Sequence, residues 1–268
     1  MPLAVCATPI GNLDDVTLRV LAELREADVV LAEDTRHTRG LLERHGIRAP
    51  LLSYHEHNEA ARTAELLPRL TAGERIALVT DAGMPLVSDP GARLVRAAID
   101  AGVAVTVLPG PSAVETALVA SGLGGGPYAF VGFLPRKAGE LAELWRTTSA
   151  WGCAVVAFES PQRLAASLRS LAGVDPGREV AVCRELTKRF EEVVRGPAGD
   201  VAARLTEPVK GEVTLVIGAA VDAPDVDLDA AIAAVAELVA AGAGRGAAAE
   251  IVARLTGTSR NVLYRGTL

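Results

Sequence analysis

Short apolar runs alternate with amphipathic stretches along the first half of the chain. The apolar runs have the length of buried strands and cover Leu3–Thr8, Asp28–Ala32, Ile76–Thr80 and Ala104–Leu108. The stretches between them repeat apolar positions at helical spacing around Val16–Glu26, Thr38–His45, Glu59–Leu70 and Ala92–Ala101, and several end in a C-cap glycine, namely Gly46, Gly73 and Gly102. This alternation predicts an α/β fold with a mostly parallel sheet covered by helices on both faces.

A glycine cluster from Gly122 to Gly126, followed by Pro127, interrupts the pattern and predicts a domain boundary. Beyond it we expect strands at Tyr128–Phe133, Ala154–Phe158, Glu179–Arg184, Glu191–Arg195 and Glu212–Ile217, and helices around Glu140–Thr147, Gln162–Leu171 and Ala198–Leu205. The strands at 179–184 and 191–195 are too close for a full helix between them. They therefore predict a hairpin and a mixed sheet.

The composition changes after Gly218. Residues 222–241 hold five acidic and no basic residues, a local charge of −5, whereas residues 245–268 hold four arginines and one glutamate, a local charge of +3. We therefore expect an N-terminal α/β domain at 1–121, a C-terminal α/β domain at 122–220 and a small helical module at 221–268. Residues 247–264 resemble a helix-turn-helix, whose second helix carries the recognition residues. A helical cap that packs on the body or on a partner subunit is the alternative.

Composition limits the class of protein. With 268 residues, 50% of them hydrophobic, the chain can build a large core, and the intrinsically disordered class is excluded. The net charge of −6 indicates that any nucleic-acid site is a local basic patch. Three widely spaced cysteines in apolar runs fit a reducing compartment, and we expect a soluble cytoplasmic protein with no metal site and no membrane span.

Candidate chemistry lies where the strands of the first half end. Four clusters rich in glycine, proline or charged residues follow these strands, at Thr8–Asn12, Glu33–Arg36, Asp81–Pro85 and Pro109–Ala113. In an open α/β sheet, ligands bind beyond the carboxyl ends of the strands, so the clusters predict one binding site at this edge. The common phosphate-binding loops are missing, because the glycine cluster at 122–126 does not fit GxGxxG and no GxxxxGK[ST] occurs.

These clusters carry a resemblance to a known family. The segments Thr8-Pro-Ile-Gly-Asn-Leu13, Ala32-Glu-Asp-Thr-Arg36, Tyr54-His-Glu-His-Asn-Glu59, Asp81-Ala-Gly-Met-Pro-Leu-Val-Ser-Asp-Pro-Gly91 and Pro109-Gly-Pro-Ser-Ala113 follow one another as in the tetrapyrrole-methylase superfamily. With Gly132–Lys137, Phe158–Arg163, Arg184–Lys188 and Lys210–Glu212, the chain most resembles the branch that methylates small-subunit ribosomal RNA.

The resemblance implies two α/β domains with S-adenosylmethionine between them, usually within a homodimer. It further implies methyl transfer to the 2′-hydroxyl of a cytidine in the decoding region of 16S ribosomal RNA. The residues that would bind the cofactor are Pro9, Ile10, Asp81, Ala82, Gly83, Met84, Val87, Ser112, Ala113 and Phe158. At position 84 this branch usually has Thr, so Met84 removes a polar side-chain contact that backbone groups would have to replace.

The methyl group of a sulfonium is already activated, so most of the rate can come from holding the ribose oxygen in line with it. A base then helps to remove the hydroxyl proton. The acidic candidates at the strand ends are Glu33, Asp34 and Asp89, although Asp34 and Asp89 are also natural helix caps. Candidate contacts to RNA are the basic or polar side chains Arg36, His55, His57, Arg136, Lys137, Arg184, Lys188 and Arg189. His55 and His57 would share one side of a strand if the strand continued through them.

Two other functions remain open. One keeps the fold but methylates carbon in a corrin precursor, or modifies a protein side chain. The other is a non-enzymatic nucleic-acid-binding regulator that uses the basic C-terminal residues.

Overall fold

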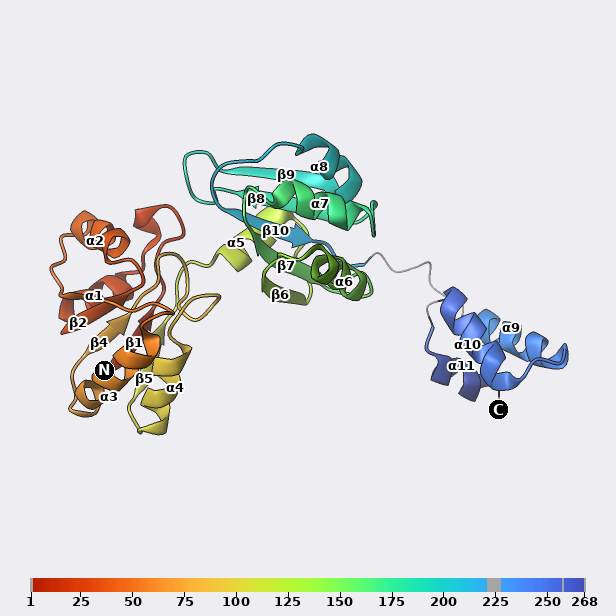
Figure 1. Ribbon diagram of the computed structural model, residues 1–268, viewed down its shortest axis with the longest axis horizontal. Coiled ribbons are helices and arrows are strands. Elements are labelled where there is room, and N and C mark those ends of the chain that lie inside the picture. The colour runs from red at the N-terminus through yellow and green to blue at the C-terminus, as the bar shows by residue number, and fades with distance from the viewer. Residues whose placement is uncertain (1, 221–227, 257, 268) are drawn as a thin grey trace. The chain divides into compact units, whose positions relative to one another are not determined.

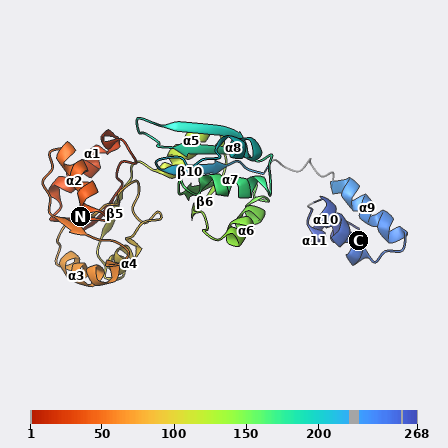
Figure 2. The ribbon, with the colours of Figure 1, turned by 45° about the horizontal axis from the view of Figure 1, so that its top comes forward.

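The computed structural model describes residues 2–220, 228–256 and 258–267. The chain forms two compact units, Met1–Ala219 and Ala220–Leu268. Within the larger unit, the described residues build two five-stranded sheets, each with its own helices (Figures 1 and 2).

The first sheet is entirely parallel, in the order β3-β2-β4-β1-β5. Its strands are β1 (Leu3–Cys6), β2 (Val29–Ala32), β3 (Leu51–Ser53), β4 (Ile76–Leu78) and β5 (Val105–Leu108). The central strands β1, β2 and β4 are fully buried, which is why they read as continuous apolar runs in the sequence.

Helices cover both faces of this sheet, as the alternating pattern predicts. They are α1 (Leu18–Glu26), α2 (Thr35–Arg44), α3 (Glu59–Thr71) and α4 (Ala92–Asp100). One apolar core contains Leu24 of α1 and Leu41 of α2, and the core on the other side contains Leu66 of α3 and Leu94 of α4. The predicted C-cap glycines Gly46, Gly73 and Gly102 all have positive φ, of 62°, 92° and 71°.

Four details of this sheet differ from the prediction. Strand β1 ends at Cys6, because Thr8 leaves the parallel ladder and forms an isolated antiparallel bridge with Gly83. Strand β3 was not expected, since three residues are too few to show a period. Helix α2 begins at Thr35 and not at Thr38, because the Asp34 side chain accepts a hydrogen bond from the Arg36 backbone and caps the helix. A short 3-10 turn, η1 (Leu13–Asp15), precedes α1.

The second sheet is mixed, in the order β6-β7-β10-β8-β9. Its strands are β6 (Tyr128–Phe133), β7 (Ala154–Glu159), β8 (Glu179–Arg184), β9 (Glu192–Pro197) and β10 (Val213–Ile217). Strands β8 and β9 form the predicted antiparallel hairpin, with Glu179 opposite Pro197 and Arg184 opposite Glu192. Only β6 and β7 run parallel, and β10 is antiparallel to both β7 and β8.

Helices also cover both faces of the second sheet. One face packs against α6 (Ala138–Thr148), α7 (Leu164–Ala172) and α8 (Ala198–Arg204). The other packs against α5 (Ala113–Ser121), whose Val114, Ala117 and Leu118 join the core formed by Val156, Cys183 and Val216. Helix α5 follows the last strand of the first sheet, and both ribbon views show it beside the second (Figures 1 and 2). Residues 113–121 of the expected 1–121 domain therefore belong to the core of the second sheet.

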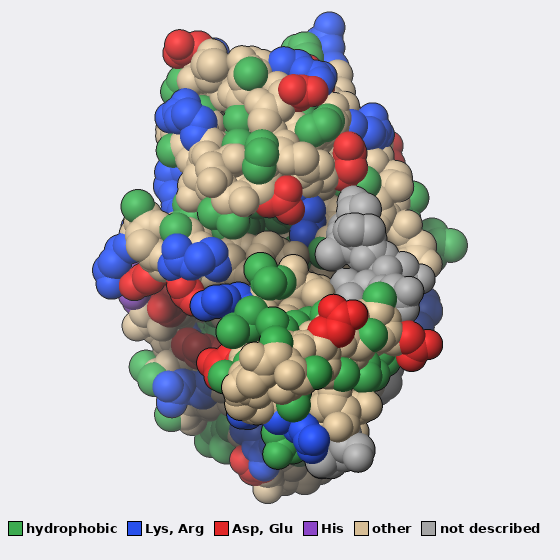
Figure 3. Space-filling model, turned by 90° about the vertical axis from the view of Figure 1, so that its right-hand side faces the viewer, with side chains coloured by type: hydrophobic (Ala, Val, Ile, Leu, Met, Phe, Trp, Pro, Cys, Tyr) green, Lys and Arg blue, Asp and Glu red, His purple; other side chains and the backbone are tan. Residues whose placement is uncertain are grey.

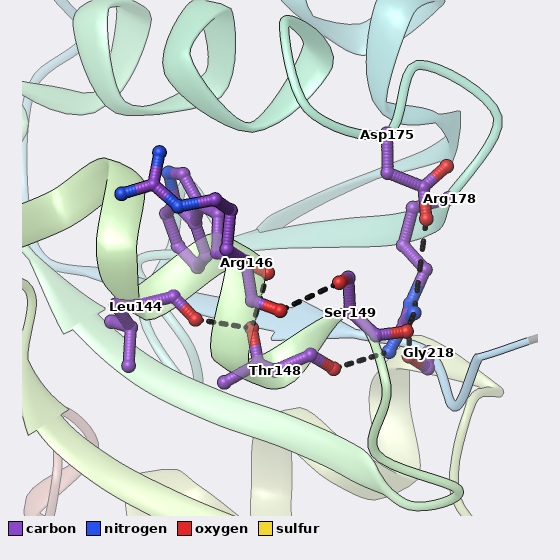
Figure 4. A network of polar contacts seen from close by, with 8 residues as sticks. Leu144, Arg146, Thr148, Ser149, Asp175, Arg178 and Gly218 are labelled. Carbon is purple, nitrogen blue, oxygen red and sulfur yellow. Dashed lines mark hydrogen bonds and ion pairs between the residues drawn. The ribbon is translucent and has the colours of Figure 1, made fainter. Parts of the chain in front are cut away.

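A buried arginine fixes the end of this sheet (Figure 4). Arg178 is 3% exposed, and its guanidinium donates to the backbone carbonyls of Thr148 (3.3 Å), Ser149 (3.1 Å) and Gly218 (2.7 Å). Burial lowers the pKa of this guanidinium, and Asp175 acts in the opposite direction from 3.7 Å. Arg178 therefore ties the C-terminus of α6 to the chain just after β10.

The smaller unit is helical, with α9 (Leu228–Ala240), α10 (Arg245–Thr256) and α11 (Arg260–Gly266) around a core that includes Val235, Val252 and Leu263. Part of the acidic stretch (221–227) and Gly257 of the expected turn lie outside the described residues. Leu255 of α10 is 77% exposed. Figure 3 views the molecule from the right-hand side of Figure 1 and shows hydrophobic side chains interspersed with acidic and basic ones.

Candidate active site

A cavity of about 370 Å³ lies in the larger unit, where loops of both sheets meet. The first sheet contributes the loops that follow β1, β2, β4 and β5, as the four sequence clusters predict. The second sheet contributes the ends of β6, β7 and β8 and the start of β10. The lining residues are Ile10, Glu33, Asp81, Ala82, Ser88, Asp89, Ala113, Phe133, Phe158, Pro161, Cys183, Leu186, Gly211, Glu212, Val213 and Thr214.

Three carboxylates from the first sheet, Glu33, Asp81 and Asp89, line one side of the cavity. The backbone N–H of Asp34 donates to Asp81 Oδ1 at 3.1 Å and holds that side chain in place. The buried Thr80 hydroxyl donates to Glu33 Oε2 at 3.4 Å and also hydrogen-bonds Asp89. Since a hydroxyl has one proton to donate, it can serve only one of the two carboxylates at a time.

Crowding and burial change the acidity of these carboxylates. Burial, with the negative charges of Glu33 and Asp81, raises the pKa of Asp89 from 3.8 to about 6, while the Thr80 hydrogen bond acts in the opposite direction. Burial and the charge of Asp81 also raise the pKa of Glu33. A carboxylate whose pKa lies near the working pH can accept a proton in one step and lose it again in the next, which is the property of a general base.

The loop that carries Asp81 and Asp89 has an unusual backbone. Leu86 and Ser88 adopt positive φ angles of 72° and 67°, a region that costs residues other than glycine of order 1–3 kcal/mol. Two backbone hydrogen bonds between Thr8 and Gly83, of 2.8 and 3.1 Å, join the start of this loop to the loop after β1. At its other end, Glu59 Oε1 accepts the backbone N–H groups of Gly91 and Arg93, both at 3.1 Å. The strained conformation is thus held from both ends.

The opposite side of the cavity is apolar and aromatic. Phe158 packs edge-to-face against Phe130 and Phe133, with ring centroids 4.9 and 5.4 Å apart. Behind it, the fully buried Glu159 side chain accepts from the backbone N–H of Ser160 at 2.6 Å and pairs with Arg163 at 3.2 Å. Arg163 also donates to the carbonyls of Leu134 (3.0 Å) and Pro135 (2.6 Å), which fixes the loop after β6 beside the loop after β7.

Two loops approach each other closely beside Leu186, which lines the cavity. A Cβ atom added at Gly11 would lie 2.6 Å from Lys188 Cγ, 2.7 Å from Thr187 Oγ1 and 2.8 Å from the Leu186 carbonyl. The backbone N–H of Asn12 donates to Thr187 Oγ1 at 3.0 Å. Only glycine fits at position 11, and this contact joins the loop after β1 to the loop after β8.

Five of the ten residues expected to bind the cofactor line the cavity, and four more lie next to lining residues. Ile10, Asp81, Ala82, Ala113 and Phe158 line it, and Gly83 lies behind Ile10 in the bridge with Thr8. Pro9, Val87 and Ser112 adjoin lining residues without lining the cavity themselves. The Met84 side chain packs into the core beneath α3 and α4, so it replaces a polar contact with an apolar one.

The acidic candidates fall into two groups. Glu33 and Asp89 line the cavity, whereas Asp34 does not: its carboxylate caps α2 and pairs with Arg36 at 2.6 Å. Several of the lining residues were not among the predicted site residues, including Phe133, Leu186 and Thr214. Cys183 is another, and because burial raises the pKa of its thiol to about 11 it stays neutral at neutral pH.

The basic candidates differ in how strongly they are already engaged. Arg36, Lys137, Arg184 and Lys188 each form an ion pair, with Asp34, Glu140, Glu192 and Glu185 respectively. Within the part of the chain that the structure describes, Arg136 and Arg189 form none. Lys188 and Arg189 line an open hollow of about 490 Å³ together with Asn12 and Arg44.

His55 and His57 lie beyond β3, which ends at Ser53, so the strand does not continue through them. Their rings are 5.9 Å apart in an edge-to-face arrangement. His55 Nε2 lies 3.2 Å from the side-chain amide of Asn58, and His55 Nδ1 is buried without a partner among the described residues. Among the described residues, no three His, Cys, Asp or Glu side chains are grouped so that they could hold a metal ion. Over the same residues, no helix is long and apolar enough to cross a membrane.

Comparison of the sequence with known proteins identifies the family to which the chain belongs. Residues 2–202 match the family of tetrapyrrole (corrin/porphyrin) methylases. The chain belongs to the tetrapyrrole methylase family. It is 41% identical to ribosomal RNA small subunit methyltransferase I of Streptococcus pyogenes serotype M1, over 98% of this chain and 93% of that protein. It therefore belongs to the small subunit methyltransferase I branch of the tetrapyrrole methylases.

Two further proteins show how much of the chain the fold requires. The protein of the same name from Thermotoga maritima is 42% identical, and 97% of its length matches only 80% of this chain. The crystal structure of uroporphyrin-III C-methyl transferase from Thermus thermophilus, complexed with S-adenyl homocysteine, shares the fold with a TM-score of 0.57 at 20% identity, over 81% of this chain and 96% of that one. A tetrapyrrole methylase fold is therefore complete without about a fifth of the present chain.

Proposed function

We propose that this methyltransferase transfers a methyl group from S-adenosylmethionine to the 2′-hydroxyl of a cytidine in the decoding region of 16S ribosomal RNA. The observation that carries the proposal is the group of carboxylates, Glu33, Asp81 and Asp89, in a cavity at the strand ends of a tetrapyrrole methylase fold. The near full-length similarity to ribosomal RNA small subunit methyltransferase I supports the choice of substrate.

The residues of the cavity fit this cofactor. S-adenosylmethionine carries a sulfonium and an ammonium group, whose positive charges suit the carboxylates of Asp81 and Glu33. Its adenine needs an apolar slot, which Ile10, Ala113 and Phe158 can form. The cofactor supplies an electrophilic methyl group when it is bound.

The chain's own residues then have three tasks. The loops hold the ribose oxygen in line with the methyl group, which is where most of the rate enhancement of such a transfer can arise. Asp89 accepts the proton of the 2′-hydroxyl, and burial, the charge of Glu33 and the Thr80 hydrogen bond set the pKa at which it can do so. The apolar wall around Phe158 excludes water from the reacting atoms.

RNA would approach through the basic side chains around the cavity. Arg136 and Arg189 are the cations best able to meet phosphate, because they form no ion pair within the described residues. The remaining candidates, Arg36, Lys137, Arg184, Lys188, His55 and His57, would contribute after exchanging their present partners. We place the reaction in the cytoplasm, where the small subunit is assembled.

We further propose that the protein acts as a homodimer. Leu18 of α1 and Val119 of α5 are 84% and 82% exposed, and apolar side chains so exposed are of the kind that a subunit interface covers. Light scattering coupled to gel filtration would test this, and a mass of one chain at micromolar concentration would contradict it.

The proposed function is tested with purified protein, small ribosomal subunits from a strain that lacks this gene, and S-adenosylmethionine. We expect 2′-O-methylcytidine in the digested ribosomal RNA. Ala113→Leu, which places a larger side chain in the cavity, should weaken cofactor binding at least tenfold in calorimetry, an effect of about 1.4 kcal/mol or more. A base-methylated nucleoside, or methyl transfer only to a small tetrapyrrole, would overturn the assignment.

A further inference from the structure

An irregularity in β6 turns one aromatic side chain toward the cavity. Phe130 lies opposite Val156 of β7, but Phe133 lies opposite Phe158, so three steps along β6 match two along β7. The extra residue is a β-bulge, which re-aims the side chains that follow it. Gly132 lies in the bulge with a φ of +70°, a conformation that glycine adopts without strain.

The bulge decides which face of the sheet Phe133 occupies. Val131 packs into the core beneath α6 and α7, and in a regular strand Phe133 would point to that side too, because alternate residues share a face. With one residue inserted, Phe133 instead shares the face of Phe130 and Phe158. Its ring contacts Phe158 edge-to-face and is 63% exposed.

A phenylalanine that stays exposed forgoes the stabilisation that burial of its ring would provide. The chain has only four phenylalanines, and this one lines the cavity that holds the carboxylates. A Cβ atom at the neighbouring Gly132 would lie 3.6 Å from the hydroxyl of Ser88, the residue before Asp89. The exposed ring and the carboxylate are therefore at the same part of the cavity.

The charge beside the ring is positive. Arg136 follows Phe133 by three residues, is exposed and forms no ion pair within the described residues, whereas the next residue, Lys137, pairs with Glu140. A flat aromatic ring near a free cation is an arrangement by which proteins hold an unpaired base and its phosphate. Base, phosphate and ribose of one nucleotide would then meet Phe133, Arg136 and Asp89.

We propose that Phe133 is the platform on which the base of the target nucleotide stacks while its ribose is methylated. This inference rests on the proposed function. It deepens that function by stating how the nucleotide is presented: the base is removed from its own stack and laid against the protein.

The test compares Phe133→Leu, Phe133→Ala and Phe133→Trp with the wild-type protein on small subunits from a strain that lacks the gene. Stacking is worth about 1–3 kcal/mol per base, so kcat/KM should fall about 5- to 150-fold in the Leu and Ala variants. Trp, which keeps an aromatic face, should retain most of the activity. Ile99→Ala is the matched control, since it removes an exposed apolar side chain of α4 that does not line the cavity.

Two further measurements separate this role from other uses of the ring. The affinity for S-adenosylhomocysteine and the oligomeric state should be the same in all Phe133 variants and in the wild type. The inference is overturned if Phe133→Leu is fully active, if cofactor affinity falls in parallel with activity, or if the variant changes its oligomeric state. A wild-type protein that methylates no ribosomal RNA would overturn the proposed function and this inference together, whereas an active wild type with an equally active Leu variant overturns this inference alone.

Discussion

Replacing Asp89 by Asn is expected to make the protein more stable and much less active. The carboxylate of Asp89 lies beside Glu33 and Asp81, and its raised pKa records how unfavourable its negative charge is there. Asn has nearly the same shape, and its amide oxygen can still accept the Thr80 hydrogen bond. The substitution therefore removes charge with little change in packing.

The size of the stabilisation follows from the pKa. A rise from 3.8 to about 6 corresponds to about 3 kcal/mol of unfavourable free energy for the ionised side chain in the folded protein. Asp89 is only partly buried, so water screens part of this, and we expect about 1–2 kcal/mol.

The effect has a defined dependence on pH. Between about pH 4 and pH 6 the folded protein holds a proton on Asp89 that the unfolded chain releases, so wild-type stability falls across this window and the penalty is complete above it. The difference in stability between Asp89→Asn and wild type should be near zero at pH 4 and largest above pH 6. Urea unfolding at several pH values would measure it.

Activity should move in the opposite direction. Loss of a general base costs about 10²–10⁴-fold, so kcat should fall by that factor in Asp89→Asn. In the wild type, kcat/KM should decline below about pH 6, as Asp89 is protonated. Thr80→Val should shift this decline to higher pH, because the Thr80 hydroxyl lowers the pKa of Asp89. An Asp89→Asn variant with wild-type activity, or one less stable than wild type at pH 8, would refute the reasoning.

Three other predictions concern the frame around the site. Gly11→Ala should displace the 186–188 loop, since its Cβ would meet backbone as well as side-chain atoms, and we expect at least tenfold weaker cofactor binding in calorimetry with the fold intact by circular dichroism. Arg178→Met leaves the carbonyls that this side chain bonds without a partner and should cost about 3 kcal/mol or more in urea unfolding. The matched control is Arg146→Met on the surface of α6, which should cost less than about 1 kcal/mol. Removing residues 220–268, a separate compact unit, should leave cofactor affinity unchanged. The slope of the logarithm of RNA affinity against the logarithm of salt concentration should become shallower by about 0.7–0.9 for each RNA phosphate that this unit neutralises. A truncated protein that binds and methylates RNA like the full chain would show that this unit is only a cap.

Much of the fold could be predicted because its strands form short apolar runs, several of which are buried on both faces. Tyr128–Phe133 and Glu179–Arg184 have the bounds that their apolar runs indicate. Helix α5 was missed because Val114, Ala117, Leu118 and their neighbours give it almost no polar face, so it lacks the helical period that reveals amphipathic helices. Its packing on the second sheet depends on residues far apart in the sequence, which no local pattern records.

Residues of the candidate site could be predicted where they lie in loops that directly follow strands. Glu33, Asp89 and Ala113 come directly from such loops and line the cavity. The sequence does not show where an acidic side chain points. In the structure Asp89 lines the cavity, whereas the Asp34 side chain caps α2. Phe133 could not be found in the same way, because its position depends on a bulge and on the pairing of β6 with β7.

The most direct measurement is the analysis of 16S ribosomal RNA from a strain that lacks this gene. Mass spectrometry of nuclease digests would compare this strain with the same strain carrying either the wild-type gene or Asp89→Asn. We predict that one cytidine loses a methyl group from its ribose, that the wild-type gene restores it, and that Asp89→Asn restores little or none. Ribosomal RNA with an unchanged set of ribose-methylated cytidines in the deletion strain, or full restoration by Asp89→Asn, would contradict the account.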